Sequence, residues 1–125
     1  KIMQKKILVL DDDLIVTEIL GQLVKNLGYY PVIAHNAPIL ASAKIKEFDA
    51  ILLDLWLSDS TAEESLEAIA GQAFRGQIVL ISGLDNEALE DACEKGRRLG
   101  LRVNGFLRKP VNVESLKALL ADLEY

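Results

Sequence analysis

Five short apolar runs alternate with stretches of helical periodicity along this chain. Continuous runs of four or five apolar residues are typical of strands that are buried on both faces of a parallel sheet. They predict strands near residues 6–10, 30–34, 50–53, 77–81 and 103–107. Tyr29, Tyr30 and Pro31 make the second of these look like an edge strand.

Helical periodicity fills the intervals between the predicted strands. The first helix has an apolar face made of Ile15, Ile19, Leu20, Leu23, Val24 and Leu27. Gly28 supplies the stop of this helix. We expect Asn36 to cap a second helix, with Pro38 tolerated in its first turn, and Asn112 to cap the last.

The third and fourth helices carry more specific signals at their starts. Ser60 and Glu63 have the spacing of a capping box for the third helix. Asp85 is the expected cap of the fourth helix, and Leu84 and Leu89 are placed to form a hydrophobic staple around it. Each interval between strands therefore predicts one helix.

The pattern as a whole predicts an α/β fold of the flavodoxin-like (βα)₅ type, a three-layer sandwich around a parallel five-stranded sheet. Right-handed crossovers and short connections favour the strand order 2-1-3-4-5. Residues 1–125 are expected to form a single domain. The opening Lys-Ile-Met suggests a domain cut from a longer multidomain protein.

Composition and charge exclude several classes of protein. Half of the residues are apolar, which excludes a disordered chain, and no apolar run approaches the roughly 20 residues that cross a bilayer. The net charge of −5 does not favour direct nucleic-acid binding. The single cysteine, Cys93, favours a reducing, cytoplasmic location.

Polar residues follow the predicted strands where each strand ends. Asp11 and Asp12 end the first apolar run, Asp54 the third, Ser82 the fourth and Lys109 the fifth. Because parallel strands end at one rim of the sheet, we expect these side chains to meet there. Three carboxylates, a hydroxyl and an ammonium group together suggest a divalent cation and a phosphoryl group.

Crowded carboxylates favour a metal ion at this rim. Two carboxylates ~4 Å apart repel by ~4 kcal/mol at an effective dielectric of about 20, and Mg²⁺ would relieve this repulsion. Helix capping is the alternative role for these acids, and it suits Asp13. Asp54 is either a third metal ligand or a nucleophile towards phosphorus. Ser82 and Lys109 are suited to holding phosphoryl oxygens, the alternatives being a turn residue and a solvated lysine.

Four motifs resemble those of a two-component response-regulator receiver domain. They are residues 7–12, the Leu-Asp-Leu at 53–55, Ser82-Gly83 and Lys109-Pro110. The resemblance covers nearly the whole chain. It implies that Asp54 is the phospho-acceptor, and that the acidic pair before the first helix binds Mg²⁺ or Mn²⁺.

The resemblance also assigns the remaining site residues. Lys109 would contact the phosphoryl group, Ser82 would be the switch hydroxyl, and Phe106 would be the aromatic residue that turns inward with it. The backbone carbonyl of Trp56 would complete the metal site. The Lys109-Pro110 peptide bond is expected to be cis. The switch would change the face made by helix 4, strand 5 and helix 5.

The partners follow from the same resemblance. A sensor histidine kinase or a phosphotransfer protein would donate the phosphoryl group. A covalently linked or separate effector domain would read the switch, and a homodimer through helix 4, strand 5 and helix 5 is a further option. No contact with nucleic acid or membrane and no turnover of a separate substrate are expected.

Two segments depart from the common receiver pattern. In the loop after Asp54, Ser58 replaces a proline and Ala62 stands where glycine is usual. Residues 94–104 form a longer connection than usual, which a longer helix 4 could explain. The phrase at residues 100–107 is similar to receivers that are joined to EAL-type cyclic-di-GMP phosphodiesterases.

Two other functions compete with the phosphorylated switch. A haloacid-dehalogenase-type phosphatase would use Asp11 as the nucleophile, with Asp13 two residues on. It lacks the acidic pair that should follow the lysine, and it gives Asp54 no role. A receiver-fold binding module that works without phosphorylation is the other alternative, although all the signature residues are present.

Overall fold

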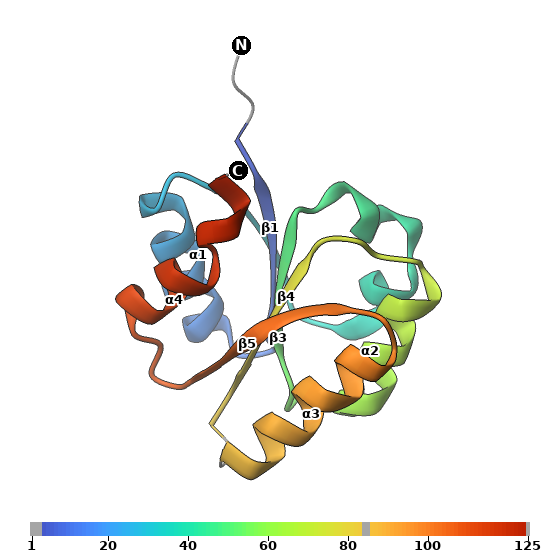
Figure 1. Cartoon of the computed structure of the whole chain (residues 1–125). Coiled ribbons are helices and arrows are strands. Elements are labelled where there is room, and N and C mark those ends of the chain that lie inside the picture. The colour runs from blue at the N-terminus through green and yellow to red at the C-terminus, as the bar shows by residue number, and fades with distance from the viewer. Residues whose placement is uncertain (1–3, 84–85, 125) are drawn as a thin grey trace.

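The computed structural model describes residues 4–83 and 86–124, and its centre is one parallel sheet with helices on both faces (Figure 1). The strand order is β2-β1-β3-β4-β5, as predicted. The strands are β1 (Lys6–Leu10), β2 (Tyr30–Ala34), β3 (Ala50–Asp54), β4 (Gln77–Ser82) and β5 (Arg102–Arg108). The predicted strands and the flavodoxin-like fold are therefore confirmed.

Helices cover the sheet on both sides. The α-helices are α1 (Leu14–Asn26), α2 (Ala62–Gly71), α3 (Asn86–Arg98) and α4 (Val113–Leu119). Three short 3₁₀ helices are η1 (Ala37–Ala41), η2 (Ala43–Glu47) and η3 (Ala121–Glu124). In Figure 1, α1 and α4 lie on one side of the sheet and α2 and α3 on the other. Within the described residues, no helix has the length and apolar character that crossing a membrane requires.

Alternate strand residues belong to two separate cores, one on each face of the sheet. In β1, Leu8 and Leu10 pack with the core beneath α2 and α3, whereas Ile7 and Val9 pack with the core beneath α1 and α4. All four side chains are fully buried. Double-sided burial explains why the strands are continuous apolar runs rather than alternating ones.

The segment after β2 was predicted to be a single α-helix, and this prediction was wrong. Residues 37–47 form η1 and η2, two 3₁₀ helices separated by Ser42 in an extended conformation. The Ser42 hydroxyl accepts a hydrogen bond from the Lys44 N–H, so it begins a new turn instead of continuing the first. Asn36 precedes η1, but its side chain makes no capping hydrogen bond. Leu40 and Ile45 still bury completely against the sheet.

The capping box of α2 lies one residue later than predicted. Thr61 accepts a hydrogen bond from the Glu64 N–H, and Glu64 accepts one from the Thr61 N–H. Ser60 instead contacts the hydroxyl of Ser65. The cap predicted for Asn112 is confirmed. The cap and staple predicted at residues 84 and 85 lie outside the described residues.

The apolar face predicted for α1 was partly wrong. Leu20 and Val24 are buried as expected, but Ile15 is 70% exposed and Ile19 is 56% exposed. Thr17 occupies the buried position nearest the start of the helix. The buried stripe of α1 is formed by residues 17, 20 and 24.

Residues 94–104, the connection predicted to be longer than usual, contain the last part of α3 and the start of β5. Helix α3 ends at Arg98, and β5 contains a bulge at Asn104, where the pairing moves from Val103 to Gly105. The Asn104 amide donates hydrogen bonds to the Gln77 side chain and, over 2.8 Å, to the Leu119 carbonyl. The bulged residue thus joins the start of β4 to the end of α4.

Candidate functional site

Main-chain hydrogen bonds bring the ends of four strands together at one rim of the sheet. The Leu55 N–H donates to the Ile81 carbonyl over 3.1 Å, and the Lys109 N–H donates to the Ser82 carbonyl over 3.1 Å. Asp11 follows the last residue of β1, the neighbour of β3. The backbone therefore places the predicted site residues side by side, as the parallel topology requires.

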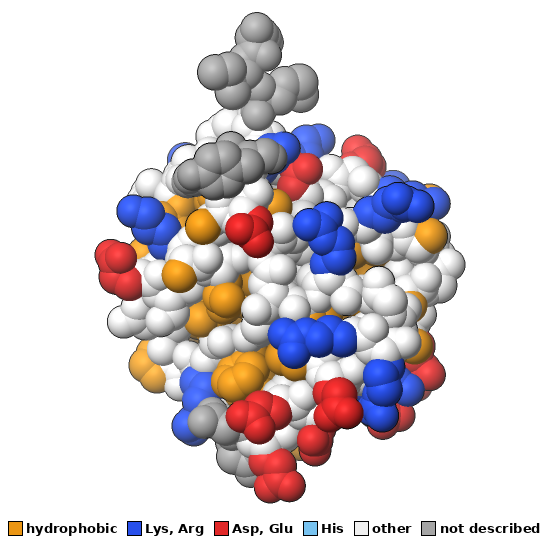
Figure 2. All heavy atoms as spheres, in the orientation of Figure 1, with side chains coloured by type: hydrophobic (Ala, Val, Ile, Leu, Met, Phe, Trp, Pro, Cys, Tyr) orange, Lys and Arg blue, Asp and Glu red, His pale blue; other side chains and the backbone are white. Residues whose placement is uncertain are grey.

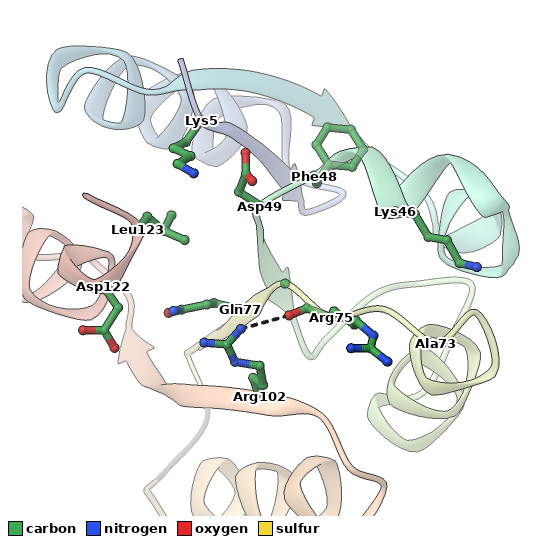
Figure 3. Close-up of a pocket in the computed structure, with 11 residues that line it drawn as sticks. Lys5, Lys46, Phe48, Asp49, Ala73, Arg75, Gln77, Arg102, Asp122 and Leu123 are labelled. Carbon is green, nitrogen blue, oxygen red and sulfur yellow. Dashed lines mark hydrogen bonds between the residues drawn. The ribbon is translucent and has the colours of Figure 1, made fainter. Parts of the chain in front are cut away.

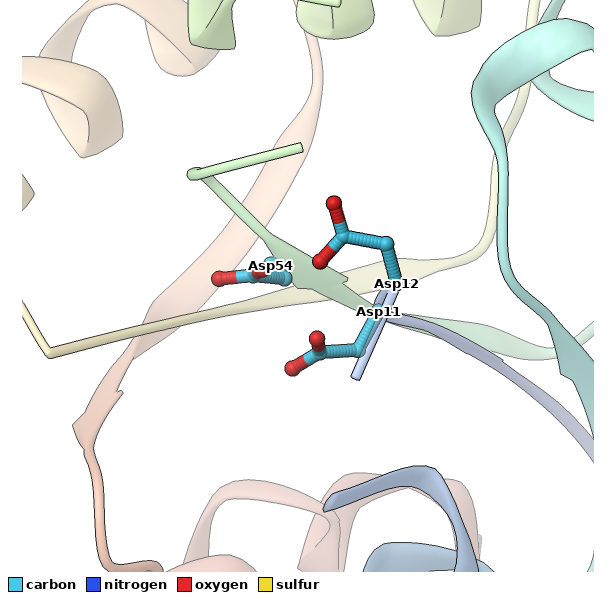
Figure 4. A group of neighbouring side chains, drawn as sticks. All are labelled: Asp11, Asp12 and Asp54. Carbon is cyan, nitrogen blue, oxygen red and sulfur yellow. The ribbon is translucent and has the colours of Figure 1, made fainter. Parts of the chain in front are cut away.

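Asp11, Asp12 and Asp54 form one compact acidic cluster (Figure 4). One carboxylate oxygen from each lies within 4.8 Å of the others. Asp11 is 1% exposed and Asp54 is 2% exposed, whereas Asp12 is half-buried. Burial weakens the screening by water, so mutual repulsion inside this cluster is stronger than it would be on an open surface.

Backbone N–H groups hold the carboxylates of the Asp11–Asp12 pair in place. The Asp13 N–H donates to Asp11 Oδ1 over 2.9 Å, and Asp13 itself caps α1. The Ser58 N–H donates to Asp12 Oδ2 over 2.9 Å. A proline at position 58 would have no N–H to donate, so the departure from the common receiver loop has a direct effect on Asp12. Sequence reasoning missed both backbone contacts.

Lys109 provides the positive charge of the site. Its Nζ lies 2.7 Å from Asp11 Oδ2 and 3.5 Å from Asp54 Oδ1. Burial acts to lower the pKa of Lys109, but the hydrogen bond to Asp11 and the charge of Asp54 outweigh it, so that the pKa is raised overall. The ammonium group therefore stays charged and bridges the two most buried carboxylates.

Asp54 is the carboxylate whose ionisation is most perturbed. Burial, followed by repulsion from Asp11, raises the pKa of Asp54 to about 6. Lys109 and a hydrogen bond from the backbone of Trp56 oppose this shift. A raised pKa for a buried carboxylate in a cluster of acids is typical of functional sites.

The cluster fits a hard divalent cation. Asp11 Oδ2 and Asp54 Oδ1 are buried oxygens that share the single ammonium group of Lys109. Three carboxylates carry more negative charge than the single Lys109 neutralises. Oxygen ligands of this kind suit Mg²⁺, which keeps several waters and binds through one or two carboxylates.

The structure places the remaining predicted residues around this cluster. Ser82 is fully buried at the end of β4, and Phe106 is half-buried on β5, where it packs against the core beneath α2 and α3. The Lys109-Pro110 bond is cis. The Trp56 side chain is 71% exposed. The backbone of Trp56 forms a hydrogen bond with Asp54. The role predicted for the Trp56 carbonyl, as a metal ligand, stays a prediction.

Comparison with known proteins agrees with this geometry. The family model for the response regulator receiver domain matches residues 7–121. The chain is 30% identical over 124 residues to the transcriptional regulatory protein KdpE of Staphylococcus aureus, and covers 51% of it. It is 27% identical over 119 residues to the transcriptional regulatory protein CrdR of Helicobacter pylori, and covers 53% of it. These alignments include 98% and 93% of this chain.

Solved structures show the same fold. A response regulator from Colwellia psychrerythraea is 25% identical with a TM-score of 0.77, and the match covers 97% of both chains. The receiver domain of the Francisella response regulator 1452 has a TM-score of 0.80 at 20% identity and 96% coverage of both chains, a likeness of fold alone. The chain spans about half the length of the curated relatives it matches. It belongs to the family of response regulator receiver domains.

Proposed function

We propose that Asp54 is the phospho-acceptor of this receiver domain, and that its phosphorylation operates a two-component switch. The observation that carries the proposal is the position of Asp54: it is buried at the end of β3, close to two further carboxylates and 3.5 Å from the Lys109 ammonium. Receiver domains in general act as switches and have no separate substrate to turn over.

The transfer chemistry follows from the groups around Asp54. An Asp54 oxygen attacks phosphorus, a P–O bond forms, and the P–N bond of a phosphohistidine donor breaks, with the electron pair leaving on the imidazole. Asp11, Asp12, Asp54 and the Trp56 carbonyl are the proposed ligands of Mg²⁺ or Mn²⁺. When bound, the metal would neutralise negative charge on the phosphoryl oxygens. The ammonium group of Lys109, which already lies 3.5 Å from Asp54 Oδ1, would bind a phosphoryl oxygen.

The proposed output begins at Ser82 and Phe106. Ser82 lies in β4 opposite Arg108 of β5, two residues beyond Phe106, so a displacement of Ser82 is transmitted directly to β5. The face called helix 4, strand 5 and helix 5 in the sequence prediction corresponds to α3, β5 and α4. A groove of about 490 Å³ between β5 and α4 includes Phe106 and Leu119 in its lining. A shift of population between two arrangements of this face is the proposed signal.

The proposed partners are those of the family. A sensor histidine kinase or a phosphotransfer protein donates the phosphoryl group, and an effector domain, linked or separate, responds to it. Homodimerisation through α3, β5 and α4, a cytoplasmic location and the absence of direct nucleic-acid binding by this domain complete the proposal. The possible link to an EAL-type domain stays a prediction.

Phosphorylation with a small-molecule donor tests the proposal. The protein is incubated with Mg²⁺ and acetyl phosphate, and intact-mass spectrometry measures the added phosphoryl group. We expect one labile adduct on the wild-type chain and none on Asp54→Asn. Asp91→Asn, which changes an exposed carboxylate on α3, is the matched control and should be labelled like the wild type.

Three outcomes would contradict the proposal. A wild-type chain without an adduct would favour a binding module that works without phosphorylation. A label that persists in Asp54→Asn but is lost in Asp11→Asn would favour the phosphatase-type nucleophile. A label of equal yield in Asp54→Asn and Asp11→Asn would place the acceptor elsewhere.

A further inference from the structure

The amino ends of the strands border a hollow at the opposite edge of the sheet from Asp54. This hollow has a volume of about 570 Å³ (Figure 3). Its lining comes from all parts of the chain: Lys5 before β1, Asp49 before β3, Gln77 of β4, Arg102 of β5 and Asp122 of η3. We call this space the basal hollow. Nothing in the receiver chemistry described above uses it.

The basal hollow is positively charged in a protein of negative charge. Four cationic side chains and two carboxylates line it, a surplus of two positive charges, whereas the whole chain carries −5. The cationic residues are Lys5, Lys46, Arg75 and Arg102. In Figure 2, many acidic side chains lie at the lower end of the molecule, whereas Lys and Arg are prominent in its upper part, where a few acidic side chains lie among them.

Within the described residues, these four cations take part in no ion pair. In the part of the chain that the structure describes, none of the four has a carboxylate oxygen within 4.0 Å. Asp49, one of the two acids in the lining, uses its Oδ2 to accept a hydrogen bond from the Lys6 N–H over 2.8 Å. An anion that entered the hollow would therefore meet positive charge without displacing an existing ion pair.

Two of the cationic groups are directed into the same space. Figure 3 shows Lys5 and Arg102 extending from opposite sides towards the middle of the hollow. Arg102 Nη1 donates to the Arg75 carbonyl over 3.2 Å, which holds the guanidinium group across the opening. A guanidinium fixed in this way has further N–H groups for a phosphate, which it can bind through two parallel hydrogen bonds.

The walls of the hollow also offer an aromatic surface. Phe48 is half-buried and lines one side of the hollow. A second hollow of about 410 Å³ shares Ala73, Arg75 and Arg102 with the first. The volume of the basal hollow, about 570 Å³, lies in the usual range of roughly 300–1,000 Å³ for small-molecule sites.

We propose that the basal hollow binds a small phosphate-bearing anion between Lys5 and Arg102. Simple phosphates would use the two cations alone, whereas a nucleotide would also place its base against Phe48. The site is independent of phosphorylation at Asp54, because it lies at the other end of the strands.

Titration calorimetry with ADP and with pyrophosphate tests this site. The measurements use EDTA at low ionic strength, so that no metal ion can bridge a phosphate to the acidic cluster. We expect binding of at least one of the two anions. Arg102→Gln and Lys5→Gln should each weaken it about tenfold, the usual effect of losing one charged hydrogen-bond donor. Arg98→Gln removes a charge at the end of α3, outside the lining, and should leave binding unchanged.

The two anions distinguish the sources of the phosphate. Tighter binding of ADP than of pyrophosphate, with the difference lost in Phe48→Leu, would identify a nucleotide. Equal affinities would identify a simple phosphate. Absence of binding at millimolar concentration, or equal loss in Arg98→Gln and Arg102→Gln, would overturn the proposal. Labelling of Asp54 in Arg102→Gln by acetyl phosphate reports that this variant is folded, whichever result is obtained.

Discussion

The two ends of the sheet hold their charges in different ways. At the carboxyl end, Asp11 and Asp54 are almost completely buried and share one ammonium group, that of Lys109. At the amino end, Lys5 and Arg102 are exposed around an open hollow. Like charges lie close together at both ends of the sheet, but only those at the carboxyl end are buried away from solvent.

Burial decides how strongly neighbouring charges affect each other's ionisation and the stability of the protein. Water screens the exposed cations of the amino end, so their crowding has little effect on stability. At the carboxyl end, burial and then repulsion from Asp11 raise the pKa of Asp54 to about 6. A bound cation or a covalent phosphoryl group therefore changes the energy of the carboxyl end far more than an anion changes that of the amino end.

Removal of a proposed metal ligand should have the largest effect. Asp12→Asn should weaken Mg²⁺ binding about a hundredfold, since the number of charged ligands sets affinity for this ion. The side-chain oxygen of asparagine can still accept the hydrogen bond from the Ser58 N–H, so the loop after β3 keeps this contact. Quenching or enhancement of Trp56 fluorescence during a Mg²⁺ titration measures the affinity.

Asp13→Asn is the matched control for this ligand. Asp13 caps α1, and asparagine caps helices equally well. The Mg²⁺ affinity of this variant should stay within about twofold of wild type. Equal losses in the two variants would mean that general negative charge, and not coordination by Asp12, attracts the metal.

Neutralising Asp54 should stabilise the metal-free protein in a pH-dependent way. The pKa of Asp54 is raised from 3.8 to about 6 by folding, so its protonated form favours the fold and this contribution disappears as the pH rises through about 6. Asp54→Asn should therefore increase the free energy of unfolding by about 2–3 kcal/mol at roughly pH 7.5, and by little near pH 4.

Urea unfolding across this pH range provides the measurement. Asp91→Asn, at an exposed position, should show no such pH-dependent gain. Mg²⁺ should narrow the difference between wild type and Asp54→Asn, because the ion stabilises the ionised carboxylate. A gain of equal size at all pH values would contradict the assignment of the effect to Asp54 ionisation.

Loss of the polar contact at the bulge of β5 should destabilise the fold without affecting the metal site. Asn104→Ala removes the hydrogen bonds to Gln77 and to the Leu119 carbonyl, at a cost of about 2 kcal/mol. Asn26→Ala removes only an exposed side-chain contact with Gln22 and should cost less than about 0.5 kcal/mol. Chemical unfolding measures both, and a change in Mg²⁺ affinity in Asn104→Ala would show that the two ends are coupled.

Relief of backbone strain beside the basal hollow should have the smallest effect. Ala73 has a φ of 55°, in the left-handed region that favours glycine. Ala73→Gly should therefore stabilise the protein by about 0.5–1 kcal/mol. Ala70→Gly, inside helix α2, should destabilise it by a similar amount, about 0.5–1 kcal/mol. If both variants lose stability in urea unfolding, the conformation of Ala73 is not strained.

Local patterns predicted the strands well and the helices less well. Ile7 to Leu10 were correctly predicted as a doubly buried strand, because the run is short and has no polar face to expose. Residues 37–47 were misassigned because the competition between Ser42 and the helix backbone is decided by one hydrogen bond. The capping box was predicted one residue too early because Ser60 and Thr61 both match the motif. In the fold, the Ser60 hydroxyl contacts Ser65, so Thr61 is the residue that caps α2.

Local sequence patterns are enough to predict the order of the strands and the identity of the charged residues at the carboxyl end. Regular apolar runs specify strands, and a parallel topology brings their ends together whatever the details of packing. Three properties do not follow from local patterns: how deeply Asp54 is buried, which face of α1 contacts the sheet, and that Lys5 and Arg102 border one hollow. These properties depend on contacts between residues far apart in the chain, and such contacts form only when the sheet and its two layers of helices are assembled.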